Sequence, residues 1–129
     1  MYLNLNNKKF WQIGELKERV INLLGLNITI RPIYIGNDNI LHMQTEHPID
    51  YSNYGSDIAI ILNNPTYVSK HPDCGDGAIH YIRVYNPGNI YVKLVVRPTK
   101  KEVLFVRSLF IISRRNIHQY WTSQSLKSY

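Results

Sequence analysis

Three consecutive runs of β-branched and aromatic residues, at positions 78–85, 90–97 and 103–112, restrict what this chain can fold into more than any other feature. Hairpin-length loops join them, Asn-Pro-Gly-Asn at 86–89 and Pro-Thr-Lys-Lys at 98–101. Strands joined by loops this short pair as antiparallel hairpins. We therefore expect residues 78–112 to form an antiparallel meander.

The rest of the chain has mostly helical patterns. Leu16, Val20 and Leu24 recur at helical spacing in residues 15–24, and Gly25 follows as a C-terminal cap. Residues 28–35 are β-branched but contain Pro32, which indicates an edge strand or an extended connector. A second helix is expected over residues 37–47, with Asn37 or Asp38 as its N-terminal cap and Pro48 as its end. A third is expected over residues 56–62, beginning at Ser56. A last helix should follow Ser113 and carry an apolar stripe of Ile117, Tyr120 and Trp121. We expect residues 1–12 and 122–129 to be peripheral or frayed.

Composition limits the class of protein. A chain of 129 residues, 44% of them hydrophobic and 19% charged, is long enough for one globular domain spanning 1–129. Its net charge of +6 suits a polyanionic partner such as nucleic acid, although a merely basic soluble protein would have the same charge. The one cysteine, Cys74, cannot form an internal disulfide, and no signal peptide or membrane span is recognisable, so we expect action in the cytoplasm and no membrane partner.

Residue parity predicts which side chains share a face of the sheet. With two even loops, Lys93 would lie opposite Ile82 in the first hairpin and opposite Val106 in the second. Arg107 then falls on the core side, which a guanidinium tolerates only if it is paired or if a bulge resets the parity. The predicted core face holds Tyr81, Tyr85, Ile90, Val92, Leu94, Val96, Val103, Phe105 and Leu109. The predicted polar face holds His80, Ile82, Tyr91, Lys93, Val95, Arg97, Val106 and Ser108.

Histidines precede this sheet. His42 and His47 are five residues apart, a spacing that does not stack them as metal ligands, and His42 is one turn before Glu46, which could orient it. For each, a structural role at an interface between elements remains open. His71 and Cys74 are too few for a four-ligand zinc pattern, and no cofactor motif is present, so neither a metal nor a cofactor is expected.

Several of these segments together resemble a known family. They are residues 34–42 (YIGNDNILH), His47-Pro48, a helix ending at Asn64-Pro65, residues 91–97 (YVKLVVR) and residues 106–112 (VRSLFII). The stretch from Gly14 to Tyr120 is similar to the phage-associated nuclease domains of the barnase, EndoU, colicin and RelE superfamily, the BECR fold. The resemblance implies an α+β fold in which N-terminal helices precede a four-stranded antiparallel β-sheet, with a short C-terminal helix.

The same resemblance implies a metal-independent endoribonuclease, often a toxin met by an antitoxin or immunity protein. Carried over by position, the family's helix histidine matches His42, its His-Pro element matches His47, its mid-sheet basic residue matches Lys93, and its last-strand pair matches Arg107 and Ser108. In this interpretation a histidine moves the proton of the 2′-hydroxyl, Lys93 and Arg107 stabilise the charged phosphorane, and Ser108 binds a phosphate oxygen. His80, Tyr81, Tyr91 and Arg97 are the expected RNA-binding residues, and the RNA could be a tRNA.

Two other functions fit the same residues. A non-catalytic RNA-binding module would use the basic sheet to hold a strand and aromatic rings to stack on it. A phage regulatory domain that binds a protein partner would fit the fold but leaves the polar face without a role. Dependence of an activity on the histidines would separate the nuclease from both.

Overall fold

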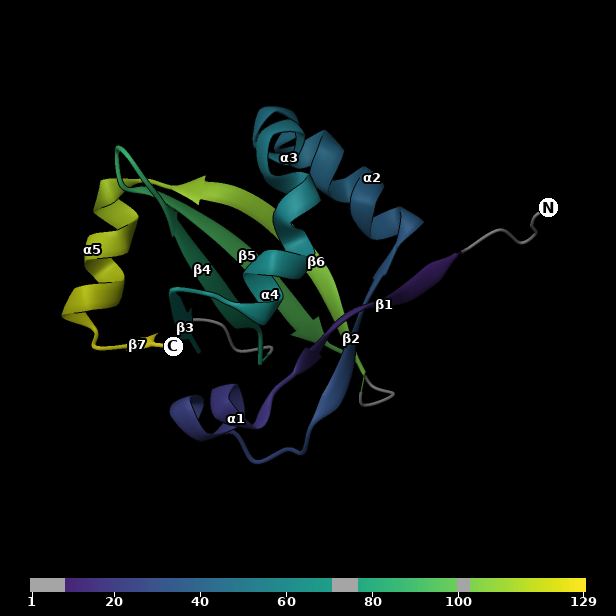
Figure 1. Cartoon of the computed structure of the whole chain (residues 1–129), viewed down its shortest axis with the longest axis horizontal. Helices are drawn as coiled ribbons and strands as arrows, with labels where there is room; N and C mark the ends of the chain where they lie inside the picture. The colour runs from purple at the N-terminus through teal and green to yellow at the C-terminus, as the bar shows by residue number, and fades with distance from the viewer. Residues whose placement is uncertain (1–8, 71–76, 100–102) are drawn as a thin grey trace.

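The computed structural model of the protein describes residues 9–70, 77–99 and 103–129 (Figure 1). Seven strands and five α-helices are found in this described part of the chain, together with one 3-10 turn at Gly55–Asp57. The strands are β1 (Phe10–Leu16), β2 (Arg31–Gly36), β3 (Tyr67–Ser69), β4 (Ile79–Tyr85), β5 (Ile90–Pro98), β6 (Leu104–Ile112) and β7 (Leu126–Ser128). The helices are α1 (Glu18–Leu24), α2 (Asn37–Glu46), α3 (Pro48–Tyr54), α4 (Ile58–Asn63) and α5 (Arg114–Thr122).

All seven strands form one mixed sheet in the order β1-β2-β6-β5-β4-β3-β7. Every neighbouring pair is antiparallel except β2 and β6, which pair in parallel at only two positions, Ile33 with Leu104 and Tyr34 with Phe105. The expected four-stranded antiparallel sheet behind N-terminal helices is therefore wrong, because a strand opens the described chain and the sheet is larger and mixed. Pro32 is tolerated in an interior strand because its one partner is Glu15 of β1, outside the short ladder to β6.

The first hairpin has the expected register, with Lys93 opposite Ile82. The second does not: Lys93 lies opposite Phe110 instead of Val106, because the connection turns at Thr99 to Val103 and a β-bulge follows. The bulge places Arg107 as the extra residue between Val106 and Ser108 and leaves its side chain exposed. Val106 is therefore buried in the core, whereas Phe105 lies on the opposite face, so both of these face assignments were wrong.

The helices follow local sequence signals closely. Gly25 ends α1 with a positive φ of 62°, and Ser113 caps α5 by accepting a hydrogen bond from the Asn116 N–H. The N-terminal cap of α2 is Gly36, whereas Asn37 or Asp38 was expected to cap this helix. Pro48 does end α2, but it also starts α3, because proline at the first position of a helix loses no hydrogen bond.

Both ends of the described chain join the sheet. Phe10 to Gln12 pair with β2, and β7 pairs with β3 as the edge strand of the sheet. Both segments were expected to be peripheral. Strands of three residues, such as β3 and β7, are too short to show an alternating pattern.

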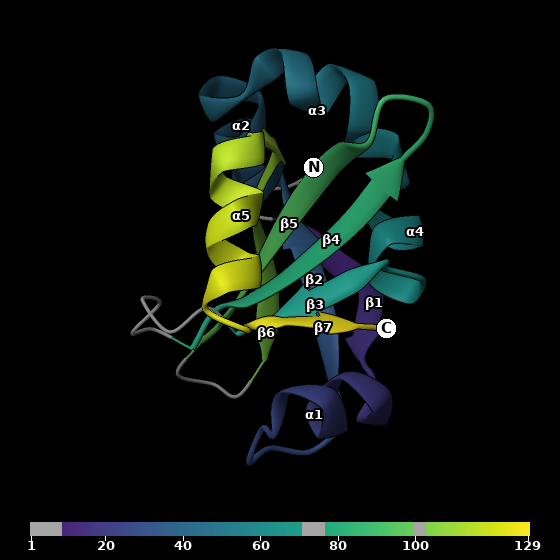
Figure 2. The ribbon, with the colours of Figure 1, turned by 90° about the vertical axis from the view of Figure 1, so that its left-hand side faces the viewer.

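The two faces of the sheet are covered differently. The main core lies on the face covered by α1, α2 and α4, where Val20, Met43 and Ile61 meet buried residues of β4, β5 and β6. The other face, which we call the α5 face, carries a smaller cluster formed by Ile82, Ile112, Ile117, Tyr120 and Leu126. Figure 2 shows α5 beside β5 and β4, with α2 and α3 above it.

None of the helices in the described ranges has the length and hydrophobicity that a transmembrane span requires.

Candidate active site

Polar side chains occupy successive rows on the α5 face, because alternate residues of a strand point to the same side. His80, Val95 and Ser108 lie directly across from one another on β4, β5 and β6. The next row holds Ile82, Lys93 and Phe110. Arg97 and Phe105 form a row on the other side of Ser108. The predicted gathering of His80, Tyr91, Lys93, Arg97 and Ser108 on one face is therefore what the structure has.

His47 approaches Lys93 across the ring of Phe110. The His47 imidazole stacks on Phe110 with ring centroids 4.7 Å apart and an interplanar angle of 24°. The Lys93 Nζ lies 5.1 Å from the centroid of the same ring. The imidazole and the ammonium are thus within about 10 Å of each other, although 46 positions separate them along the chain.

A contact between α3 and β6 fixes this approach. Beyond Tyr34 and Phe105, β6 has no partner strand on its β2 side within the described chain, and Asp50 Oδ2 accepts a hydrogen bond of 3.0 Å from the Ile111 N–H. Asp50 is three residues after His47, so this bond holds the junction between α2 and α3 against β6. His47 lies on Phe110 for that reason.

Tyr120 and His80 support Lys93 from the α5 side. The Lys93 Nζ lies 5.4 Å from the centroid of the Tyr120 ring, and the Tyr120 hydroxyl is 2.8 Å from His80 Nδ1. Tyr120 and His80 are each only 3% exposed. Tyr120 therefore lies against the lysine, and His80 holds the Tyr120 hydroxyl in place. His80, expected to contact RNA, has almost no surface to do so.

A hollow of about 230 Å³ lies at the Arg97 row, beyond Ser108 from Lys93, and is lined by Asn39, Arg97, Phe105 and Arg107, among others. Two guanidinium groups thus border one concave surface, Arg97 from the α5 face of β5 and Arg107 from the bulge. A guanidinium group can bind two oxygens of one phosphate through parallel hydrogen bonds. The hollow is the part of the site best suited to a phosphate.

His42 lies on α2, one turn after Asn39 and so on the same side of the helix. Its Nε2 is 3.9 Å from Glu46 Oε1, the partner that the sequence suggested, and its side chain is 37% exposed. His42 therefore lies on the same side of α2 as Asn39, which lines the hollow, whereas His47 lies against Phe110.

Two expected RNA-binding tyrosines lie elsewhere. Tyr81 is fully buried in the main core, where burial, with a further contribution from Tyr129, raises the pKa of its hydroxyl; it has no surface on which a base could stack, so that expectation was wrong. Tyr91 is on the α5 face but is half-buried against the cluster beneath α5.

The weak zinc pattern of His71 and Cys74 lies outside the described residues. Within 9–70, 77–99 and 103–129, His, Asp and Glu side chains form no group of three that could hold a metal ion.

Sequence reasoning missed two members of the site. Phe110, which links His47 to Lys93, was assigned no role, and Tyr120 was expected only as part of an apolar stripe. The stripe itself was a usable signal, since a tyrosine buried in it needs a hydrogen-bond partner.

A basic sheet face on which an imidazole and an ammonium converge beside two guanidinium groups is the kind of site found in enzymes that act on phosphodiesters. Comparison with protein families agrees: residues 11–119 match the model of the phage-Barnase-EndoU-ColicinE5/D-RelE like nuclease 3 family. The chain belongs to this family of phage-associated nuclease domains, which confirms the resemblance seen in the sequence. No curated protein and no solved structure matches the chain significantly.

Proposed function

We propose that this domain is a metal-independent endoribonuclease that cleaves RNA by attack of the 2′-hydroxyl on the adjacent phosphate. The observation that carries the proposal is the convergence of His47 and Lys93 on the ring of Phe110. Cleavage by this route needs a group that accepts a proton, a cation that stabilises the phosphorane and an acid for the leaving oxygen. Family membership supports nuclease chemistry, and RNA as the substrate is our inference from these groups.

In the proposed mechanism, the imidazole of one histidine, His47 or His42, takes the proton of the 2′-hydroxyl. The 2′-oxygen then bonds to phosphorus, and the bond from phosphorus to the 5′-oxygen breaks. A second protonated group, for which the other histidine is the candidate, gives a proton to the leaving 5′-oxygen. The products are a 2′,3′-cyclic phosphate and a 5′-hydroxyl, so the proton taken and the proton given balance.

The cations have separate tasks in this mechanism. Lys93 faces the phosphorane as charge builds on its equatorial oxygens. Arg107, beside Arg97 in the hollow, holds a neighbouring phosphate of the same strand, and the Ser108 hydroxyl, in the row between Arg97 and Lys93, donates to a phosphate oxygen. Exposed Arg107 is the one of these groups that reaches RNA with least rearrangement.

The biological role we propose is that of a toxin or phage-related effector, neutralised in its host by an antitoxin or immunity protein. In this role, uncontrolled RNA cleavage would stop the growth of a bacterium, and the partner would prevent it. Growth arrest on expression, relieved by His47→Ala, would support this role, and normal growth with abundant folded protein would count against it.

The nuclease proposal predicts RNA cleavage in the presence of excess EDTA. Incubation with single-stranded, transfer and ribosomal RNA, followed by analysis of the ends, should give 2′,3′-cyclic phosphates and 5′-hydroxyl groups. Intact RNA throughout, together with tight binding that weakens steeply with salt, would favour the non-catalytic RNA-binding module instead. Cleavage that leaves a 3′-hydroxyl would exclude attack by the 2′-hydroxyl.

A further inference from the structure

Three aromatic rings gather where β1, β2 and β6 lie side by side on the α5 face. The ring centroid of Phe10 is 5.7 Å from that of Tyr34 and 5.8 Å from that of Phe105, and Tyr34 and Phe105 are also 5.8 Å apart. Phe10 is 58% exposed, and Tyr34 and Phe105 are partly exposed. We call Phe10, Tyr34 and Phe105 the aromatic platform. An exposed set of large rings is costly in water unless a partner covers it.

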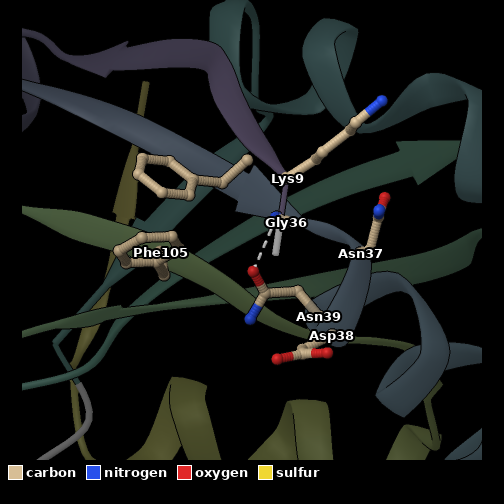
Figure 3. A pocket seen from close by; sticks show the side chains of 7 residues that line it. Lys9, Gly36, Asn37, Asp38, Asn39 and Phe105 are labelled. Atoms are coloured by element: carbon tan, nitrogen blue, oxygen red, sulfur yellow. Dashed lines mark hydrogen bonds between the residues drawn. The ribbon is translucent and has the colours of Figure 1, made fainter. Parts of the chain in front are cut away.

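Two hollows meet at this platform. Phe105 and Asn39 line both the hollow that contains Arg97 and Arg107 and a second one of about 290 Å³ that also includes Lys9 and Phe10. Figure 3 shows Phe105 from β6 and Asn39 from α2 bordering this second hollow. Asn39 is fixed there because its Oδ1 accepts a hydrogen bond of 2.7 Å from the Gly36 N–H. The platform is thus one wall of a continuous concave surface.

Charge along this surface separates two environments. Arg97 lies directly opposite Phe105 on the next strand, and with Arg107 it makes the inner hollow basic. The outer hollow contains the carboxylate of Asp38 as well as Lys9, so its net charge is close to zero (Figure 3). A phosphate is therefore favoured at the arginines, and an uncharged aromatic group at the platform.

Strand β5 connects the platform side of the surface with the proposed reaction centre. Arg97 and Lys93 point to the same side of β5 four residues apart, which is ~13 Å at the rise of a β-strand. An RNA strand with its reacting phosphate at Lys93 would pass Arg97 and bring a neighbouring base to Phe105.

We propose that the aromatic platform stacks an unpaired base of single-stranded RNA, with the adjoining phosphate held by Arg97 and Arg107. This inference rests on the proposed function, which places the reacting phosphate of the RNA at Lys93. It adds the class of substrate, which is RNA whose bases are free to leave the helical stack. Base-paired RNA offers no free base face to a ring, so duplexes are poor ligands.

The test uses a short 2′-O-methyl RNA strand, which lacks the 2′-hydroxyl nucleophile and so measures binding without cleavage. Fluorescence anisotropy should show that Phe10→Ala and Phe105→Leu each weaken binding of the single strand at least ~5-fold, the loss expected for one stacked base. Trp11→Ala is the matched control, because Trp11 is the next residue of β1, is 45% exposed and points to the other side of the sheet. Trp11→Ala should bind like the unmodified protein.

Removing a base from the probe makes the test specific. One abasic position in the strand should weaken binding to the unmodified protein and cause no further loss in Phe10→Ala, because the ring and the base act as a pair. Equal binding by Phe10→Ala, Phe105→Leu and the unmodified protein would overturn the platform, even if unmodified RNA is cleaved. The predicted losses in a protein that leaves unmodified RNA intact would keep the platform and overturn the nuclease.

Discussion

His47→Ala is expected to lower the rate of RNA cleavage by ~100-fold or more, the loss typical of removing a general acid or base. The reason is positional: the His47 ring and the Lys93 ammonium both lie against Phe110, within about 10 Å of each other. The rate is measured on a fluorescent RNA under single-turnover conditions, so that product release does not mask the chemical step.

Two controls accompany this substitution. His118→Ala removes an exposed histidine of α5 and should leave the rate unchanged. His47→Gln keeps a planar polar group on Phe110 but cannot exchange a proton near neutral pH, so it should be as slow as His47→Ala while unfolding at the same urea concentration as the unmodified protein. Full activity in His47→Gln would assign this side chain to packing and leave His42 as the acting histidine.

Lys93→Met should also lower the cleavage rate by ~100-fold or more, since it removes the charge proposed to stabilise the phosphorane. Methionine keeps an unbranched apolar stem between the rings of Phe110 and Tyr120, so the packing of this region is largely retained. Because charge is lost from the transition state, kcat is expected to fall more than KM rises.

Lys127→Met is the matched control, with a lysine removed from the exposed strand β7. It lowers the net charge of the protein by the same amount, so any general weakening of RNA attraction appears in both variants. Equal, small losses in Lys93→Met and Lys127→Met would mean that Lys93 acts only through net charge.

Local sequence signals were sufficient for part of the fold. Strand alternation placed Lys93 and Arg97 on one face of β5, because a period of two is a property of the strand itself. The helix ends at Gly25 and Ser113 were equally readable, since capping depends on a few neighbouring residues.

Features that depend on distant contacts were not predictable. The bulge at Arg107 shifted the second hairpin, and only the clash of a guanidinium with the core hinted at it. The parallel pairing of β2 with β6 places Ile33 beside Leu104, and no local sequence pattern around either residue predicts this contact. These pairings turned the expected meander into a larger mixed sheet.

The site was predicted in its residue types and less well in its geometry. Lys93, Ser108 and His80 share a face as expected, but His80 turned out to be buried beneath Tyr120 instead of exposed to RNA. His47 and Lys93 meet at Phe110, and the hydrogen bond from the Ile111 N–H to Asp50, between residues 61 positions apart, holds α3 against β6 there. Pattern analysis has no access to such a contact.

The central claim is that His47 and Lys93 act on the same phosphate, and the double variant His47→Ala with Lys93→Met tests it most directly. Groups that act as one unit show strongly non-additive losses, so the double variant should cleave RNA at nearly the rate of the slower single variant. If the two losses instead multiply, with both proteins folded and binding RNA, the side chains act independently and the shared site proposed for the α5 face is wrong.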